Sequence, residues 1–329
     1  MTVKLRKMKT WSKLAAKKRR PSEYEIVTTN LQTRHRHPEQ AYELSPASDF
    51  VFNKWYKDHV FESPLQHDDW EEFRDPDELI YRVYTRTQDA QEEYIDGLLD
   101  EYNEIEHDAS ISPEWLAVLE RLYTPCRYLQ TTLQMNAAYL VQITPASTLT
   151  ACSVFQEGDE FRWLSRIAYR TRELQNAHPS LGFGKKEREY WEKDPAWQGV
   201  RELMEKVLAT YDWGENFVSS NLIAKPVIDE ILRQLGATAR HSGDPLVSML
   251  VDNQLRDSER SRRWSTAVVE FSKEYGENKT VIAEWIKKWM PLAANAISTY
   301  CEALPDSPNA AKTALANVEA FHRSLGVVD

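Results

Sequence analysis

The sequence predicts an all-α protein, a bundle of long helices with peripheral helices around it. Glycine is scarce, at 10 of 329 residues, which disfavours turn-rich β barrels and glycine-rich phosphate loops. From about residue 75 onward, apolar side chains recur every three or four residues, the spacing of one helix face. No alternating run is long enough to predict a strand, so helices should make up the regular structure.

Helix starts and ends are marked by prolines and capping residues. The letters DPDE (75–78) combine a cap, an early proline and acidic residues, and predict a helix from Asp75 to about His107. The same signal at SPE (112–114) opens a second helix, which Pro125 should kink and Pro145 should end. Further helices are expected over about 147–175, 197–211, 213–236, 244–275, 278–303 and 308–325.

Residues 1–60 lack a sustained period, so we expect an extended N-terminal docking arm ahead of one helical domain over 61–329. Residues 1–20 carry nine basic side chains and no acid, which leaves 32 basic and 51 acidic side chains in the remainder. Such a basic arm suits an acidic protein surface, with nucleic acid or an anionic membrane as alternatives. The candidate partner-docking residues are Trp11, Arg19, Arg20, Tyr24 and Trp55.

Cysteine usage and hydropathy predict a cytoplasmic protein. Cys126, Cys152 and Cys301 are far apart and odd in number, which favours reduced thiols and disfavours structural zinc. No apolar run approaches the 18 residues of a membrane span, and the N-terminus lacks the apolar core of a signal peptide.

Two short motifs are weak signals. The letters GFGK (182–185) lack the spacing of a phosphate loop and predict a turn before a helix. Glu104 and His107 form a Glu-x-x-His pair, which can grip one metal from a helix face. Because a dinuclear site needs two such pairs and this is the one in the sequence, we expect a solvated helix end.

Two pentads, DEFRW (159–163) and DSERS (257–261), lie 98 residues apart, each inside a predicted long helix. Both keep Asp first and Arg fourth. They resemble the D-E-x-R-H pentads of ferritin-like di-iron oxygenases, in which the Glu and His bind iron. The alternative is local ion pairing along each helix. By this resemblance, the ligand positions in this sequence hold Glu160, Trp163, Ser258 and Ser261.

The resemblance also requires a glutamate on each preceding helix, about thirty residues upstream. The two windows, 127–140 and 217–228, contain no acid. Of six expected ligands the sequence therefore offers one, Glu160. A lone carboxylate binds iron weakly, and Trp163 would fill the space with apolar packing. We therefore expect a degenerate, metal-free ferritin-like bundle with no catalytic residue.

Several long segments of the sequence show a more specific resemblance. They include KTWSKLAAKKRRPSEYEIV (9–27), SPLQHDDWEEFRDPDELIYRVY (63–84), DWGENFVSSNLIAKP (212–226) and QLRDSERSRRWS (254–265). With these words the chain resembles the β subunit of the hydroxylase component of multicomponent toluene and alkene monooxygenases, the toluene 4-monooxygenase and toluene/o-xylene monooxygenase group. One departure is Ser261, where members of this group often have His.

The resemblance implies a non-catalytic structural subunit that binds no cofactor, nucleic acid or membrane. A larger α subunit would hold the di-iron centre, a γ subunit would complete the protomer, and two αβγ protomers would pair. A Rieske-type ferredoxin and an FAD-containing reductase would deliver electrons from NADH, and an effector protein would tune the hydroxylase. The complex would insert one oxygen atom of O2 into an aromatic hydrocarbon or an alkene.

Two further functions stay open from the residues alone. A self-sufficient metalloenzyme would use Glu104, His107 and Glu160 with ligands not yet aligned. An adaptor would bind nucleic acid or membrane through residues 1–20. The identity of the hydrocarbon is not encoded here, because the substrate pocket would lie in α.

Overall fold

The computed structural model describes residues 20–29, 31 and 51–328, and within these ranges the regular structure is helical, with no strand. Trp11 and Arg19 lie outside the described residues. The helices are α1 (Glu23–Thr28), α3 (Val51–Tyr56), α4 (Tyr81–Glu104), α5 (His107–Ser110), α6 (Pro113–Val118), α7 (Cys126–Ile143), α8 (Ser147–Ala177), α9 (Glu187–Lys193), α10 (Pro195–Leu208), α11 (Trp213–Phe217), α12 (Lys225–His241), α13 (Pro245–Ser272), α14 (Asn278–Cys301) and α15 (Ala310–Ser324), with π-helical segments η2 (Lys57–Phe61), η4 (Leu119–Tyr123) and η5 (Val218–Ala224) and the 3-10 turn η3 (Trp70–Glu72).

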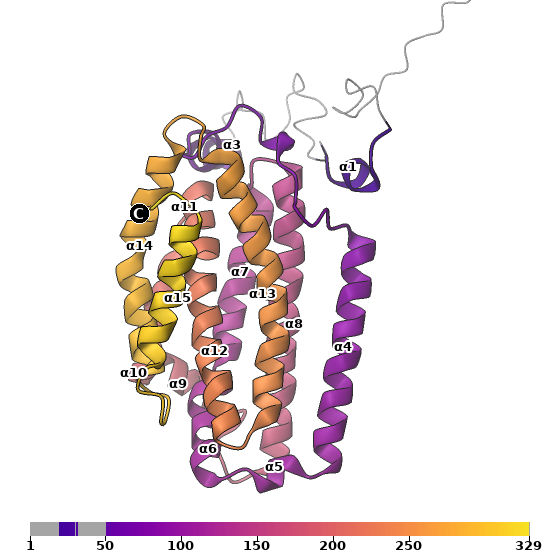
Figure 1. Ribbon diagram of the computed structural model, residues 1–329, viewed down its shortest axis with the longest axis vertical. Coiled ribbons are helices and arrows are strands. Elements are labelled where there is room, and N and C mark those ends of the chain that lie inside the picture. Colours follow the sequence, from indigo (N-terminus) through magenta and orange to yellow (C-terminus); the bar gives the residue numbers. More distant parts are fainter. Residues whose placement is uncertain (1–19, 30, 32–50, 329) are drawn as a thin grey trace, which may run out of the picture.

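Two helix pairs form the centre of the bundle (Figure 1). In the first pair, a three-residue loop joins α7 to α8, and in the second a three-residue loop joins α12 to α13. Such short loops make consecutive helices antiparallel neighbours. Helices α8 and α13, which carry the two pentads, pack against each other. The predicted all-α, ferritin-like bundle is confirmed.

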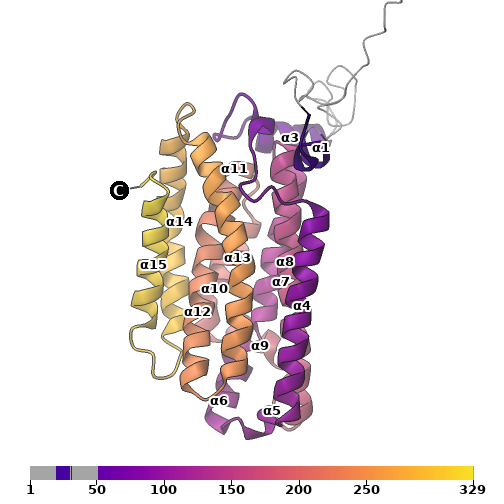
Figure 2. The same cartoon turned by 45° about the vertical axis from the view of Figure 1, so that its right-hand side comes forward.

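The peripheral helices cover the two pairs unequally. Helix α15 packs on α12, and α14 packs on α12, η5 and α10. Helix α4 stands on the opposite side (Figure 2), where it contacts α13. A small apolar cluster attaches it, made by Ile95, Leu98, Leu99, Trp163, Leu246 and Leu250. The second helix pair is therefore enclosed by its own chain to a greater extent than the first.

The first long helix begins at Tyr81, so the predicted start at Asp75 was wrong. The Asp75 carboxylate accepts hydrogen bonds from the backbone N–H of Asp77 and of Leu79, each at 3.0 Å. Glu78 has a φ of 44°, which an α-helix cannot contain. The residues of the predicted cap form a tight turn that precedes the helix.

The prediction of irregular structure throughout residues 1–60 was wrong for two segments, α1 and α3. Helix α1 starts with a capping box, in which Ser22 Oγ accepts from the N–H of Glu25 and the Glu25 carboxylate accepts from the N–H of Ser22. None of the described helices is long and apolar enough to cross a membrane. The three cysteines are free and buried.

Candidate functional site

The arginine of each pentad pairs with the aspartate of the other. Arg162 Nη1 of α8 lies 2.7 Å from Asp257 Oδ2 of α13, and Arg260 of α13 forms an ion pair with Asp159 of α8. Arg260 also lies 3.5 Å from Asp257 within its own helix. The ion pairs therefore join the two halves of the bundle, which goes beyond the local pairing considered as the alternative.

Two uncharged side chains of helix α4 donate hydrogen bonds to the pentad aspartates. Tyr84 Oη donates to Asp159 Oδ1 at 3.1 Å, and Gln88 Nε2 donates to Asp159 at 2.7 Å and to Asp257 at 3.0 Å. The indole N–H of Trp163 donates to Asp257 Oδ2 at 2.9 Å. Burial beside Asp257 raises the pKa of Asp159 to about 7, although Arg260 pulls it down. This network connects α4, α8 and α13.

A buried ammonium group pairs with the one remaining ligand-type carboxylate. Lys225 Nζ, at the start of α12, donates to Glu160 Oε1 at 2.6 Å and to Ser258 Oγ at 3.2 Å. Glu160 and Lys225 are only 2% and 6% exposed. Burial alone would lower the pKa of Lys225, but the carboxylates of Glu160 and Asp229 outweigh it and raise that pKa. Burial raises the pKa of Glu160, and Lys225 opposes the shift.

The side chains at the ligand positions do not fit a pair of iron ions. Lys225 lies in the window 217–228, where the resemblance calls for a glutamate, and a charged ammonium has no lone pair for a metal. The Trp163 indole is a donor only, and it points its N–H at Asp257. Throughout residues 51–328 and the described part of the arm, no group of three His, Cys, Asp or Glu side chains could hold a metal.

The other window, 127–140, contributes an uncharged residue. Gln130 lies thirty residues before Glu160 in sequence, on α7, and is fully buried. Its amide oxygen and nitrogen have no hydrogen-bond partner among the described residues. At this position α7 therefore places a neutral amide. The positive charge beside Glu160 belongs to Lys225 of α12.

Lys225 was not predicted as a site residue, because a glutamate was the residue expected in its window. The signal was available. Lys225 is the single charged residue in the twelve letters FVSSNLIAKPVI, and every residue of that window is buried. A lone cation in a buried helical segment indicates a buried ion pair.

The Glu-x-x-His motif does not form a helical pair, and the expectation of a solvated helix end was wrong for His107. Glu106 has a φ of 51°, so α4 ends at Glu104 and His107 begins another helix. His107 is buried, with Nε2 at 3.1 Å from Asp244 Oδ1, and the indole N–H of Trp115 donates to the other oxygen of Asp244. These contacts make His107 part of a buried structural network.

The remaining predicted residues lie apart from this site. Gly184 has a φ of 76° in a turn that precedes α9, as predicted from GFGK. Tyr24 is buried on its own chain, where its Oη accepts from the N–H of Asp75. Trp55 is half-buried beside Tyr211, with ring centroids 5.0 Å apart, and Arg20 is exposed.

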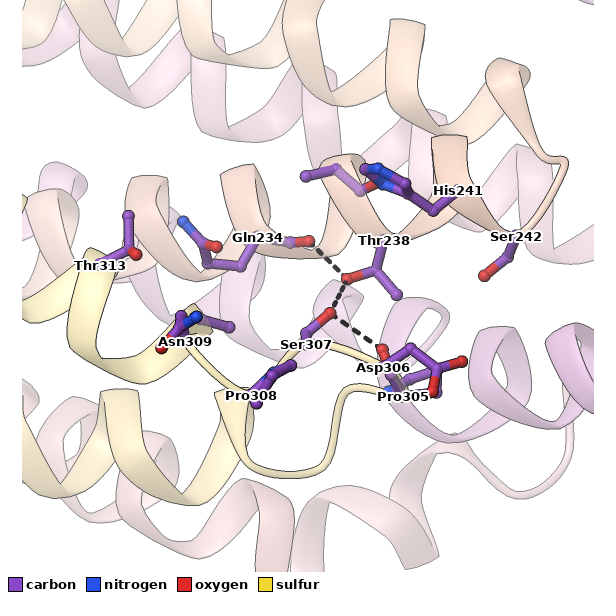
Figure 3. Close-up of a pocket in the computed structure, with 12 residues that line it drawn as sticks. Gln234, Thr238, His241, Ser242, Pro305, Asp306, Ser307, Pro308, Asn309 and Thr313 are labelled. Atoms are coloured by element: carbon purple, nitrogen blue, oxygen red, sulfur yellow. Dashed lines mark hydrogen bonds between the residues drawn. The ribbon is translucent and has the colours of Figure 1, made fainter.

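A surface cavity of about 310 Å3 opens where the loop before α15 meets the end of α12 (Figure 3). The Thr238 and Ser307 hydroxyls form a hydrogen bond there at 2.8 Å, in which one donates to the other, and the accepting hydroxyl keeps its hydrogen for a backbone oxygen, that of Gln234 or of Pro305. His241 donates a hydrogen bond from Nδ1 to the carbonyl oxygen of Ala237 at 2.7 Å. These polar groups satisfy one another and leave no arrangement of nucleophile and base.

Comparison with known proteins assigns the chain to a family. The family model described as "Methane/Phenol/Alkene Hydroxylase" matches residues 55–274. The chain is 47% identical over 298 residues to the hydroxylase component subunit beta of the toluene-4-monooxygenase system of Ectopseudomonas mendocina, and the match covers 90% of each chain. It is 24% identical to the phenol 2-monooxygenase oxygenase component DmpL of Pseudomonas sp. (strain CF600), over 83% of this chain and 86% of that one.

Solved structures agree with the sequence relatives. A chain of toluene 4-monooxygenase with toluene in its resting active site superposes with a TM-score of 0.85, at 47% identity over 91% of this chain and 98% of that chain. A chain of phenol hydroxylase from Pseudomonas sp. OX1 shares the fold, with a TM-score of 0.82 at 20% identity, over 97% of this chain and 95% of that one. The chain therefore belongs to the methane/phenol/alkene hydroxylase family.

Proposed function

We propose that this chain is the non-catalytic structural β subunit of a hydroxylase that monooxygenates aromatic hydrocarbons or alkenes. The observation that carries the proposal is the Lys225–Glu160 pair, because a lysine ammonium stands beside the one carboxylate left from the ligand set. The relative from Ectopseudomonas mendocina, named as a hydroxylase subunit beta, supports the place in a multicomponent system.

The proposal assigns the redox chemistry to other chains. The α subunit would hold the di-iron centre, γ would complete the protomer, and two αβγ protomers would pair in the cytoplasm. The effector protein and the Rieske ferredoxin would act on that assembly, with FAD and NADH in the electron-transfer components. This chain itself would bind no cofactor, since its one ligand-type carboxylate, Glu160, is paired with an ammonium group, and the other ligand positions hold an amide, an indole and two hydroxyls.

Within the assembly, the work of this chain is mechanical. The ion pairs Arg162–Asp257, Arg260–Asp159 and Lys225–Glu160 connect α8 to α13 and α12 inside the bundle. A bundle held by such contacts presents a rigid surface to its neighbour. A rigid neighbour helps the catalytic subunit keep its ligands within about 0.5 Å of the productive geometry.

The test replaces the buried pair and follows the intact hydroxylase. The double variant Lys225→Met/Glu160→Gln, co-expressed with α and γ, should assemble and retain wild-type turnover per assembled complex. The wild-type chain purified alone should contain substoichiometric iron by elemental analysis. Stoichiometric iron in the isolated chain would contradict a non-catalytic role, and so would loss of turnover in a fully assembled double variant whose unfolding midpoint equals that of wild type.

We also propose that the N-terminal arm contributes to assembly through Trp11, Arg19, Arg20 and Trp55. Tyr24 would act indirectly, by anchoring α1 on this chain. Deletion of residues 2–20 should reduce recovery of the complex with α, and the difference from wild type should shrink at high salt, where the nine basic side chains of the intact arm are screened. Unchanged recovery and turnover would remove the arm from the proposal.

A further inference from the structure

Helices α14 and α15 lie side by side on the outside of the second helix pair (Figure 1 and Figure 2), and a groove of about 640 Å3 runs between them. The groove also reaches the last described residue of the chain, Val328. Its volume and its mainly apolar lining are those of a site for a small molecule. The apolar residues that line this α14–α15 groove are Ile286, Met290, Pro291, Ala294, Leu315 and Val328.

A proline leaves a backbone acceptor at this groove. Pro291 lies inside α14 and has no N–H, so the carbonyl oxygen of Lys287, four residues earlier, lacks the donor that an α-helix normally supplies. Both residues line the groove. A backbone carbonyl without its helical partner takes a hydrogen bond from another donor, which a bound molecule can provide.

The His322 side chain adds a second acceptor. His322 lines the groove and is only 3% exposed, and its Nε2 donates to the carbonyl oxygen of Leu222 at 2.6 Å. Burial lowers the pKa of this ring, so at pH 7 it is neutral and Nδ1 carries a lone pair. Nδ1 has no hydrogen-bond partner among the described residues. The groove therefore offers two acceptors to a ligand that brings a hydrogen-bond donor.

Two cations and one acid also line the groove, which gives it a net positive charge in a chain whose net charge is −10. The Lys287 ammonium forms no ion pair within the described part of the chain. Arg323 lies 3.9 Å from Glu319, and both of these side chains are about half exposed. The excess positive charge repels a ligand whose donor is an ammonium group. Cations attract the face of an aromatic ring, and the Met290 thioether also favours aromatic contacts.

We propose that the α14–α15 groove binds a phenol, whose ring lies among the apolar side chains and whose hydroxyl donates to His322 Nδ1 or to the carbonyl oxygen of Lys287. A phenol meets all of these features, because it combines an aromatic ring with one donor and carries no positive charge. Hydroxylation of an aromatic hydrocarbon yields a phenol, so the groove would bind the product of the hydroxylase. That link to the reaction rests on the proposed function, whereas the binding itself does not.

The test measures binding of 4-fluorophenol to the full-length chain at pH 7.5 by fluorine NMR. We expect saturable binding of one equivalent with a dissociation constant of about 1 mM or tighter, which a ligand of this size can reach. 4-Fluoroanisole keeps the ring without the donor, and 4-fluorobenzylamine carries a positive charge, so each should bind about tenfold more weakly. Cyclohexanol has a donor without an aromatic ring, and should also bind about tenfold more weakly in competition with 4-fluorophenol.

Two substitutions locate the site. Ala294→Trp fills the groove and should weaken binding about tenfold or more. Pro291→Ala returns an N–H to α14 for the Lys287 carbonyl oxygen, and should weaken binding severalfold while the unfolding midpoint stays equal or rises. The matched control is Ala316→Trp, which adds the same ring at an exposed position of α15 outside the groove lining, and its affinity should stay within about twofold of wild type.

Absence of saturable binding to the wild-type chain, or wild-type affinity in Ala294→Trp, would overturn the inference. Weaker binding in Ala294→Trp with wild-type affinity in Pro291→Ala would support the site and assign the acceptor to His322. Equal affinity for any of the three comparison ligands would overturn the choice of a phenol. None of these results bears on the proposed function, which fails instead if the isolated chain holds stoichiometric iron, and phenol binding in the groove would survive that failure.

Discussion

The two helix pairs depart from a common plan in complementary ways. The first pair, α7 with α8, keeps Glu160 and has the neutral Gln130 on its other helix. The second pair, η5–α12 with α13, has Ser258 in place of a carboxylate and supplies Lys225. The charge that the first pair retains is neutralised by the second. The Glu160 carboxylate is therefore neutralised only because the two helix pairs pack together.

The pairs also differ in what covers them. Helices α14 and α15 enclose the second pair, whereas the first pair has large exposed apolar side chains, Met135 of α7 and Val154, Phe161 and Tyr169 of α8. The two pairs are therefore joined at the centre of the bundle and differ in how much of their outer side the chain itself covers. Four sets of substitutions test these differences.

The largest effect is expected from Lys225→Met, which leaves Glu160 buried without its cation. Removing one partner of a buried ion pair costs about 3–5 kcal/mol of unfolding free energy. Adding Glu160→Gln should recover part of that loss, because the uncompensated charge is then gone. Urea denaturation of the four members of the cycle measures the coupling. Lys206→Met, which breaks the exposed pair with Glu202, is the control and should cost less than about 1 kcal/mol; equal costs for the two lysines would contradict the ion-pair assignment.

A second comparison uses one buried tryptophan from each half. The Trp163 indole N–H donates to Asp257, whereas the Trp264 indole N–H is buried with no partner among the residues described. Both Trp→Phe changes remove similar volume, but Trp163→Phe also removes a hydrogen bond to a carboxylate, worth about 1.5–3 kcal/mol. Trp163→Phe should therefore lower the unfolding midpoint more than Trp264→Phe does. Equal midpoints would show that volume loss dominates at both sites, and the reverse order would contradict the assignment of the Trp163–Asp257 hydrogen bond as stabilising.

The covering of the second pair should respond to pH through His322 of α15. This ring is buried, with Nε2 at 2.6 Å from the carbonyl oxygen of Leu222, and burial lowers its pKa below the model-peptide value of 6.5. The unfolded state binds the proton more readily, so stability from this group is present above pH 6.5 and declines as the pH falls toward the folded pKa. Urea denaturation at pH 7.5 and 5.5 should show a smaller decrease for His322→Gln than for wild type. An identical pH dependence in both would exclude His322 as the cause.

The smallest effect is expected at Gln130, where a substitution should be neutral or favourable. Its two amide atoms are buried without partners, so Gln130→Leu removes an unpaired polar group at similar volume. We expect a change between zero and about 1 kcal/mol of stabilisation. Gln156→Leu is the control, because Gln156 exchanges hydrogen bonds with Asn221 and its loss should destabilise. Destabilisation by Gln130→Leu would mean that the amide has a partner after all.

Much of the fold could be predicted from local signals. Ser112 with Pro113 begins a helix, and the chain leaves α7 just before Pro145, as expected from the geometry of proline. The error at Asp75 arose because the same residues that cap a helix can also close a turn, and Glu78 with its positive φ decided for the turn. That choice depends on tertiary contacts such as the one from Tyr24.

The candidate site was predictable in part. Position counting from the pentads located Glu160, Trp163, Ser258 and Ser261, all of which are buried in the bundle. The crossed pairing of each Arg with the other pentad's Asp could not be derived, because it depends on the register of α8 against α13. Lys225, in contrast, could have been noticed as the single charged residue of its window, although its partner Glu160, 65 residues away in the sequence, could not have been named.

The lysine at position 225 has a consequence for how this protein is made in a cell. A bundle that balances its central carboxylates with iron gains part of its folding free energy from binding the ion. Here the balancing charge is encoded in the gene and is present as soon as the chain is translated. Folding of this chain should therefore not depend on the supply of iron.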